Sequence, residues 1–154
     1  MKVGYLGPPG TFAEEALLRL VGPEPEQTLV PYPTVIDCVQ AVHRGEVPEA
    51  LVPIENSIEG SVNATLDQLS AAAGEVRIHA EIVHPIRHHL LARAGVDLAS
   101  VTRLLSHPHA PPQCTDYLRT HLPDVMIVAE NSTADAVRIV SESDEPWAAI
   151  GTLR

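Results

Sequence analysis

Apolar strand-like segments alternate with helix-like segments along almost the whole chain, and this alternation limits the possible folds more than any other feature. Such a succession is typical of α/β folds that are built on largely parallel sheets. The sequence contains no internal repeat and no low-complexity segment that would interrupt it. The strands are expected at 2–6, 28–32, 50–54, 76–86, 89–94, 101–106, 125–128 and 147–150, and the helices at 11–21, 34–44, 62–73, 112–121 and 132–143.

Three of the expected helices begin with the signature of a capping box. In this signature a Ser or Thr side chain accepts a hydrogen bond from the backbone N–H three residues later, where an acidic residue stands. Gly22 and Gly45 stand where two of the helices should stop, and glycine is common just past a helix end. The capping pairs are Thr11 with Glu14, Thr34 with Asp37, and Ser132 with Asp135.

The pattern divides into two lobes, 1–78 and 79–154, with the long strand-like segment 76–86 crossing between them. Two α/β lobes joined by crossing segments are the architecture of type-II periplasmic-binding-protein folds, in which ligands bind in a central cleft. In such folds the strands end, and the following helices begin, on the side of the ligand. We therefore expect the chemistry in the loops that follow the strands.

The net charge of the 154-residue chain is −10, from 20 acidic and 10 basic residues. Nucleic acid is not an expected partner, because a basic face is needed to neutralise phosphates. An acidic protein that binds an anion must do so locally, through backbone N–H groups, hydroxyls and helix N-termini. No apolar run reaches the roughly 18 residues of a membrane helix, and no signal-peptide pattern precedes the first strand, so we expect a cytoplasmic protein without a membrane partner.

Cysteine and histidine placement favours neither a disulfide nor a metal site. Cys38 and Cys114 fall in expected helices without a CxxC pair, and we expect both to be small buried hydrophobic side chains. His84 and His88 have the spacing of a helical pair, but Pro85 between them disfavours a helix. No further ligands follow at the spacing of a metal site, and no glycine pattern of a nucleotide site occurs, so we expect no metal and no cofactor.

Polar segments follow two of the strands expected in the first lobe. Residues 7–12 form a turn of Gly and Pro that leads into a Thr-capped helix; taken alone, this is a common structural cap. Residues 52–62 carry Glu, Asn, Ser, Gly and Ser within seven positions, directly after an apolar strand. One polar residue would be enough for an Asx or Ser turn that caps the next helix. Five of them favour a binding function.

Two segments of the second lobe repeat this arrangement. In residues 106–114, Ser106 stands at a strand end, and Gln113 falls in the helix that the prolines introduce. His107 is expected to orient the loop that follows Ser106. Residues 131–134 again place small polar side chains between a strand and a helix.

These four segments read GPxGTF, VPIENSxxGSV, SHPxxxxQC and NSTADA. Each motif is short, but the ordered set over residues 3–136 resembles prephenate dehydratases. The resemblance implies a lyase that converts prephenate to phenylpyruvate by coupled decarboxylation and dehydration, in phenylalanine biosynthesis and without a cofactor. It also implies assembly as a homodimer or homotetramer, and a regulatory ACT domain that binds phenylalanine.

The resemblance also assigns site residues by motif. Asn56, Ser106 and Gln113 would hold the polar groups of the substrate, and Thr11 with the helix N-terminus behind it would bind a carboxylate. Neutral donors suffice, because the product ring becomes aromatic and the leaving hydroxyl needs only modest acid help. Glu55 either positions Asn56 or contacts the substrate. The implied catalytic residues are Thr11, Asn56, Ser106 and Gln113, and the implied substrate-binding residues are Glu55, Ser57, Gly60, Ser61, His107 and Thr133.

The chain departs from the family pattern at its end. The resemblance implies a Thr-Arg-Phe motif that carries the principal catalytic threonine, and residues 151–154 neither match this motif nor lead into an ACT domain. We therefore expect a truncated catalytic region that need not be active by itself, with a first lobe that lacks its returning segment. Two alternatives stay open: a non-catalytic small-anion binding module of the same fold, and a prephenate decarboxylase. The intact ENS and GTF segments argue against the decarboxylase.

Overall fold

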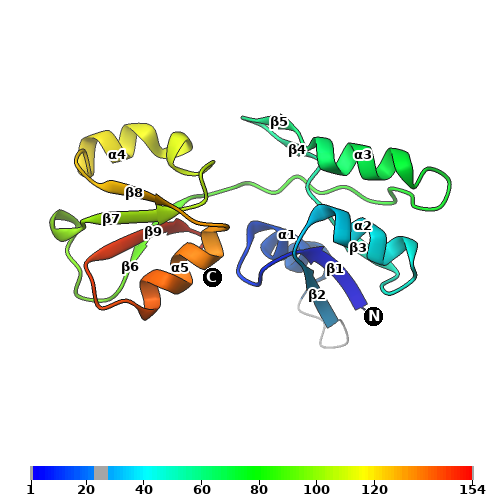
Figure 1. Ribbon diagram of the computed structural model, residues 1–154, viewed down its shortest axis with the longest axis horizontal. Helices are drawn as coiled ribbons and strands as arrows, with labels where there is room; N and C mark the ends of the chain where they lie inside the picture. The colour runs from blue at the N-terminus through cyan, green and yellow to red at the C-terminus, as the bar shows by residue number, and fades with distance from the viewer. Residues whose placement is uncertain (1, 23–27, 154) are drawn as a thin grey trace. The chain divides into compact units, whose positions relative to one another are not determined.

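The computed structural model describes residues 2–22 and 28–153, and it contains two compact units, Met1–Pro85 and Ile86–Arg154 (Figure 1). Each unit has its own sheet and its own helices, as the alternation of the sequence predicted. The units meet between residues 85 and 86, whereas the sequence placed the division between residues 78 and 79. In the described part of the chain, no helix is both long enough and apolar enough to cross a membrane.

The sheet of the first unit is parallel throughout, with the strand order β2-β1-β3. The central strand is β1 (Lys2–Leu6), flanked by β2 (Thr28–Tyr32) and β3 (Glu49–Leu51). The first two strands are confirmed at the predicted residues. The third ends at Leu51, before the predicted end at residue 54, and Pro53 has no N–H with which to continue the pairing.

Helices α1 (Phe12–Val21) and α2 (Val35–His43) pack on this sheet, and α3 (Asn63–Ala71) packs against α2. Thr11 and Thr34 are the N-caps of the first two, as predicted, and each side chain accepts a hydrogen bond from the backbone N–H three residues on. Two apolar clusters form the core. Leu17 packs with Val3 and Tyr5 in one, and Val35, Val39 and Ala72 form the other.

A small hairpin stands between β3 and α3. Its strands, β4 (Glu55–Asn56) and β5 (Gly60–Ser61), are antiparallel, with Glu55 opposite Ser61 and Asn56 opposite Gly60. Gly60 has φ 84°, a backbone conformation that glycine adopts without steric cost. The sequence predicted a polar turn here but not the pairing of its two arms.

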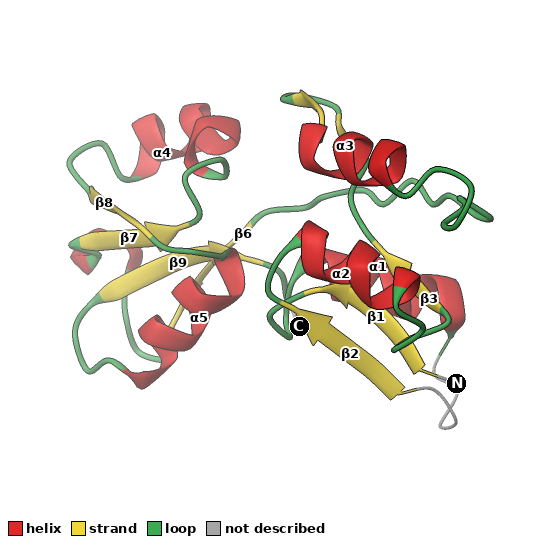
Figure 2. Cartoon of the chain, turned by 45° about the vertical axis from the view of Figure 1, so that its right-hand side comes forward, coloured by secondary structure: helices red, strands yellow, loops and turns green. Residues whose placement is uncertain are grey.

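Residues 77–88 have no regular secondary structure, and Figure 2 shows them as loop (green) throughout. The crossing strand expected at 76–86 is therefore wrong. A strand needs a neighbour to satisfy its backbone groups, and no described strand pairs with this segment. Two histidine–carboxylate contacts hold residues 77–88 against the first unit instead. These are His79 Nε2 to Glu49 Oε2 at 2.8 Å and His84 Nε2 to Glu15 Oε1 at 3.6 Å.

The sheet of the second unit has the strand order β6-β9-β7-β8. Its strands are β6 (His89–Ala92), β7 (Arg103–Ser106), β8 (Met126–Ala129) and β9 (Trp147–Gly151). β6 runs antiparallel to β9, and the other neighbours are parallel. All four strands were predicted, with ends that differ by one or two residues.

The helices of the second unit follow the prediction with one change. Residues 112–121, expected as a single helix, begin instead with the 3-10 helix η2 (Pro111–Cys114) and continue as α4 (Thr115–His121). Pro111 and Pro112 occupy the first turn, where backbone N–H groups have no partner within the helix, so their missing donors are compatible with either helix type. The last helix, α5 (Thr133–Glu142), has Ser132 as its N-cap, as predicted; a short 3-10 turn, η1 (Leu98–Ser100), precedes β7.

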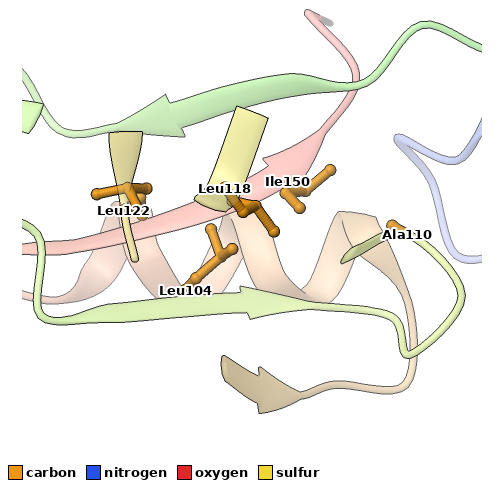
Figure 3. Packing of buried hydrophobic residues seen from close by; sticks show 6 residues of the cluster. Leu104, Ala110, Leu118, Leu122 and Ile150 are labelled. Atoms are coloured by element: carbon orange, nitrogen blue, oxygen red, sulfur yellow. The ribbon is translucent and has the colours of Figure 1, made fainter. Parts of the chain in front are cut away.

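The core of the second unit lies on both faces of its sheet. Leu104 and Ile150 pack with Leu118 and Leu122 of the α4 region, as Figure 3 shows. The alternate residues of the same strands, Leu105 and Ala149, pack with Ala136 and Val140 of α5. Since successive side chains of a strand point to opposite faces, α4 and α5 cover opposite faces of the sheet.

Candidate active site

The polar segments of the first unit both leave the carboxyl edge of its sheet. β1 and β3 are neighbouring parallel strands, with Tyr5 opposite Leu51. Residues 7–11 follow the end of β1, and residues 52–61 follow the end of β3, so the two segments start side by side. The carboxyl edge of a parallel sheet is where α/β proteins place their ligands.

Thr11 and Glu14 occupy the start of helix α1. The Thr11 hydroxyl donates to the Leu6 carbonyl at 3.1 Å, and its oxygen accepts from the Glu14 N–H at 3.4 Å. Glu14 Oε2 accepts from the Gly10 N–H at 2.7 Å, and Oε1 accepts from the Tyr5 hydroxyl at 3.1 Å. The predicted capping box is thus confirmed in its Thr half, whereas the Glu side chain reaches one residue further back than Thr11. The Thr11 hydroxyl thus donates one hydrogen bond and accepts another, both within this turn.

Asn56 closes an Asx turn at the tip of the hairpin. Its Oδ1 accepts from the backbone N–H groups of Ile58 at 2.9 Å and Glu59 at 3.3 Å. This is the structural role that a polar turn would serve in any protein. The amide N–H₂ of Asn56 makes no hydrogen bond to any described residue, so its two donors remain for a ligand. The neighbouring site candidates, Glu55, Ser57, Gly60 and Ser61, are exposed.

Thr65 of α3 binds the polar segment 52–62 through a hydrogen bond. It was not among the predicted site residues. Its side chain is fully buried, and its hydroxyl donates to the Pro53 carbonyl at 2.5 Å. The backbone N–H of Val62 donates to the Ile54 carbonyl at 2.9 Å. These bonds hold both arms of the segment against α3. A threonine within the expected helix 62–73 was the available signal, because a hydroxyl that becomes buried must find a hydrogen-bond partner.

In the second unit, three parallel strand ends converge at one sheet edge. Ser106 is the last residue of β7 and pairs in register with Ala129, the last residue of β8. β9 ends beside them at Gly151. Thr133, the first residue of α5, and the 3-10 helix η2, which contains Gln113, follow from this edge. The structure thus brings the predicted candidates of this half to the carboxyl ends of neighbouring strands.

Ser106 is fully buried, and its hydroxyl donates to the Ile150 carbonyl at 3.4 Å. Its backbone carbonyl accepts from the Glu130 N–H at 2.9 Å. Thr133 is almost completely buried at the start of α5, next to the capping Ser132. Both predicted side chains are therefore buried at this sheet edge, and the Ser106 hydroxyl ties the end of β7 to that of β9.

Gln113 is held at both ends of its amide. Its Nε2 donates to the His109 carbonyl at 2.9 Å, and its Oε1 lies 3.1 Å from His88 Nε2. His107 Nδ1 accepts from the His109 N–H at 3.4 Å, and the two imidazole rings meet edge to face with centroids 4.8 Å apart. The expectation that His107 orders the loop after Ser106 fits this local contact. No sequence pattern connects His88 with Gln113, 25 residues away.

The thiols carry the clearest electrostatic shifts. Burial, and secondarily the charge of Asp37, raises the pKa of Cys38 to about 11, and burial raises the pKa of Cys114. Both thiols are therefore poor nucleophiles at neutral pH. Cys38 is completely buried in α2, and Cys114 packs at the edge of the α4 core. Among residues 2–22 and 28–153, no group of three or more His, Cys, Asp or Glu side chains is arranged to hold a metal ion.

A family model described as prephenate dehydratase matches residues 3–154. The chain belongs to the prephenate dehydratase family. The resemblance inferred from the four motifs is confirmed, and the match extends over both units.

Individual members show the same relationship. Prephenate dehydratase of Bacillus subtilis is 39% identical over 155 residues, which cover 99% of this chain and 53% of that protein. The bifunctional chorismate mutase/prephenate dehydratase of Neisseria gonorrhoeae is 36% identical over 94% of this chain and 39% of that protein. The chain thus spans about half the length, or less, of the curated relatives it matches.

Solved structures confirm the fold. The crystal structure of prephenate dehydratase from Arthrobacter aurescens in complex with L-Phe matches 99% of this chain and 50% of that chain, with a TM-score of 0.88 at 40% identity. The α/β, periplasmic-binding-protein-like fold expected from the sequence is therefore the fold of this chain. GqqA, described as a novel type of quorum-quenching acylase, matches with a TM-score of 0.82 at 27% identity, over 99% of this chain and 54% of that one.

Proposed function

We propose that the protein to which this chain belongs is a prephenate dehydratase. The reaction releases the ring carboxylate of prephenate as CO₂ and the 4-hydroxyl, with one proton, as water, and it leaves phenylpyruvate. The observation that carries the proposal is the family match over residues 3–154, which includes all four polar segments. No redox step occurs, so neither a hydride carrier nor an electron sink is needed.

The proposed catalysis uses neutral hydrogen-bond donors. Electrons of the breaking C–carboxylate bond flow into the ring and expel the hydroxyl, which has to acquire a proton as it leaves. The free amide donors of Asn56, and the second N–H of Gln113, can bond to the carboxylate or hydroxyl oxygens of the substrate. Donors that are already oriented stabilise developing charge without having to reorganise during the reaction.

Thr11, Ser106 and Thr133 have supporting roles in this proposal. The Thr11 hydroxyl caps α1 and the Ser106 hydroxyl holds the end of β9, so neither is free in the described geometry. They would act by fixing the backbone N–H groups of the loops near the substrate. Glu55, Ser57, Gly60 and Ser61 form the exposed hairpin that presents Asn56, and His107 orders the loop before Gln113.

The proposal includes the setting of the enzyme. We infer a cytoplasmic homodimer or homotetramer that takes prephenate as its small-molecule substrate and needs no cofactor. The net charge of −10 opposes binding to nucleic acid. Since a relative was solved with L-Phe, we also infer that phenylalanine binds the complete protein. Light scattering after gel filtration, with and without phenylalanine, tests the assembly and its response.

A direct assay tests the function. The protein encoded by the natural gene is incubated with prephenate, and the products are identified by chromatography and mass spectrometry, with the 154-residue chain measured in parallel. Phenylpyruvate and CO₂ in equal amounts are expected from the natural protein. A decarboxylated product that retains the hydroxyl would identify a decarboxylase, and binding without turnover would identify an anion-binding module. Either result would overturn the proposal.

The likeness to GqqA raises acyl transfer as a second activity on this fold. An acylase needs an accessible nucleophile that is activated by a neighbouring base. Ser106, the serine at the strand end of the second unit, is fully buried and donates to a backbone carbonyl. Both cysteines have raised pKa values. These observations favour the lyase, and hydrolysis of an N-acyl amide in the same assay would contradict that preference.

A further inference from the structure

We propose that His88 is a positioning residue that sets the orientation of the Gln113 amide for the substrate. This inference rests on the proposed function, in which Gln113 offers a donor to prephenate. His88 immediately precedes β6, whereas Gln113 lies in η2, 25 residues further along the chain. The contact joins two segments that the fold brings together.

The hydrogen bonds of Gln113 determine which way its amide points. The acceptor at one end is the backbone carbonyl of His109, 2.9 Å from Gln113 Nε2. A carbonyl can only accept, so the amide nitrogen must face it. The amide oxygen then faces His88, 3.1 Å away, and His88 Nε2 must carry the proton of that bond. The His109 carbonyl thus decides which end of the amide faces His88, and the bond from His88 Nε2 then holds the amide at that second end.

This arrangement leaves one defined donor on Gln113. Of the two N–H bonds on Nε2, one points to the His109 carbonyl, and the second is fixed in direction because the amide is planar. If the His88 bond were absent, the amide could rotate about its last side-chain torsion, which has a broad energy profile. An enzyme loses rate when a donor has to be ordered during the reaction, and it gains rate when the donor is ordered beforehand.

The position of His88 suits a structural donor better than a proton-transfer group. The His88 ring is partly buried, and its Nδ1 is shielded from solvent. The bond to Gln113 needs only a proton on Nε2, which is present in the neutral Nε2–H tautomer and in the imidazolium alike. A positioning role therefore predicts that the effect of His88 does not depend on its charge.

Two substitutions at the same position separate the donor from the shape of the side chain. In the natural protein, H88L removes the donor and H88Q supplies a new N–H at a similar distance from the backbone. We expect H88L to lower kcat by about tenfold, the effect of losing one oriented hydrogen bond, with a much smaller change in KM. H88Q should recover most of the loss. H121L, which makes the same chemical change on the exposed end of α4, serves as the control and should leave kcat unchanged.

A double-mutant cycle shows whether His88 acts through Gln113. If it does, H88L causes little further loss in a Q113A background, because the group that it orients is already absent. A full tenfold loss in that background, or equal activity of H88L and wild type, would overturn the inference while leaving the proposed function intact.

A second measurement does not depend on turnover. In ¹⁵N-labelled natural protein, the side-chain amide protons of Gln113 should be shifted and well resolved in the wild type and in H88Q. In H88L, where only the His109 carbonyl still holds the amide, they should move towards the position of a solvent-exposed glutamine. If the wild type does not convert prephenate, the proposed function fails and this spectrum still tests the positioning. Unchanged Gln113 signals in H88L would refute it.

Discussion

The carboxylate of Glu14 accepts a hydrogen bond of 2.7 Å from the backbone N–H of Gly10, at the start of helix α1. Free N–H groups and the partial positive charge of a helix start make this a natural place for an anion, and here a side chain of the protein already fills part of it. A substrate carboxylate that binds at this turn must share it with Glu14. The chain as a whole is negatively charged, and a negative side chain also stands at the helix start that we expected to bind a carboxylate of the substrate.

Replacing Glu14 with Gln should strengthen the binding of prephenate. The variant removes a negative charge next to the proposed carboxylate site, and we expect the dissociation constant to fall by about two- to fivefold, the effect of one partly screened charge pair. The same change weakens the cap of α1 and should lower the free energy of unfolding by about 1 kcal/mol. Calorimetric titration and urea unfolding measure the two effects. Unchanged or weaker binding would mean that the start of α1 does not take the carboxylate.

The two functions of Asn56, turn closure and substrate binding, can be separated by N56D. An aspartate keeps the oxygen that accepts from Ile58 and Glu59, so the Asx turn survives. It loses both amide donors and adds a negative charge, so turnover should fall by at least about tenfold, which corresponds to the loss of one hydrogen bond to a charged group. Unfolding curves of N56D and the wild type should coincide. A variant with normal turnover would limit Asn56 to a role in the hairpin.

The regular elements could be predicted because their signals are local. The Thr11, Thr34 and Ser132 caps stand at the predicted residues, since a cap depends on contacts within four positions. The segment 76–86 failed as a strand because pairing depends on a neighbour that alternation alone cannot supply. Local reasoning also could not show that the helix start at Pro111 and Pro112 would be a 3-10 helix.

The sequence predicted which polar motifs form the candidate site, but it did not predict the hydrogen-bond partners of their side chains. The polar segments do lie at strand ends, because that placement follows from α/β topology. The partners of the side chains come from other elements, and these were missed: Thr65 beneath Pro53, and His88 beside Gln113. Long-range hydrogen bonds of this kind leave no periodic trace in a sequence. The local pattern also could not predict that the Ser106 hydroxyl faces the Ile150 carbonyl and not a ligand.

Stability should fall between pH 9 and 11 because of Cys38. Its pKa rises from an ordinary 9.0 to about 11 in the folded protein, so the folded state keeps a proton that the unfolded state releases in this range. The unfolded chain therefore binds fewer protons, and the free energy of unfolding decreases with pH, by up to about 2–3 kcal/mol at 1.36 kcal/mol per pKa unit. Urea unfolding at pH 8, 9.5 and 11 measures the slope. C38A should show a clearly shallower slope than the wild type, whereas parallel slopes would assign the pH dependence to other groups.

Gly151 is required where β9 passes α5. A Cβ atom at this position would lie 2.5 Å from Val137 Cγ2 and 3.5 Å from Leu91 Cδ1, and the branched valine has little freedom to move aside. G151A should therefore destabilise the second unit by about 1–3 kcal/mol, the usual cost of overpacking. V137A removes the obstructing methyl groups, so the double variant G151A/V137A should be more stable than the sum of the single changes predicts. Urea unfolding of the four proteins tests this coupling, and strictly additive free energies would show that the contact with Val137 is not what excludes a side chain at residue 151.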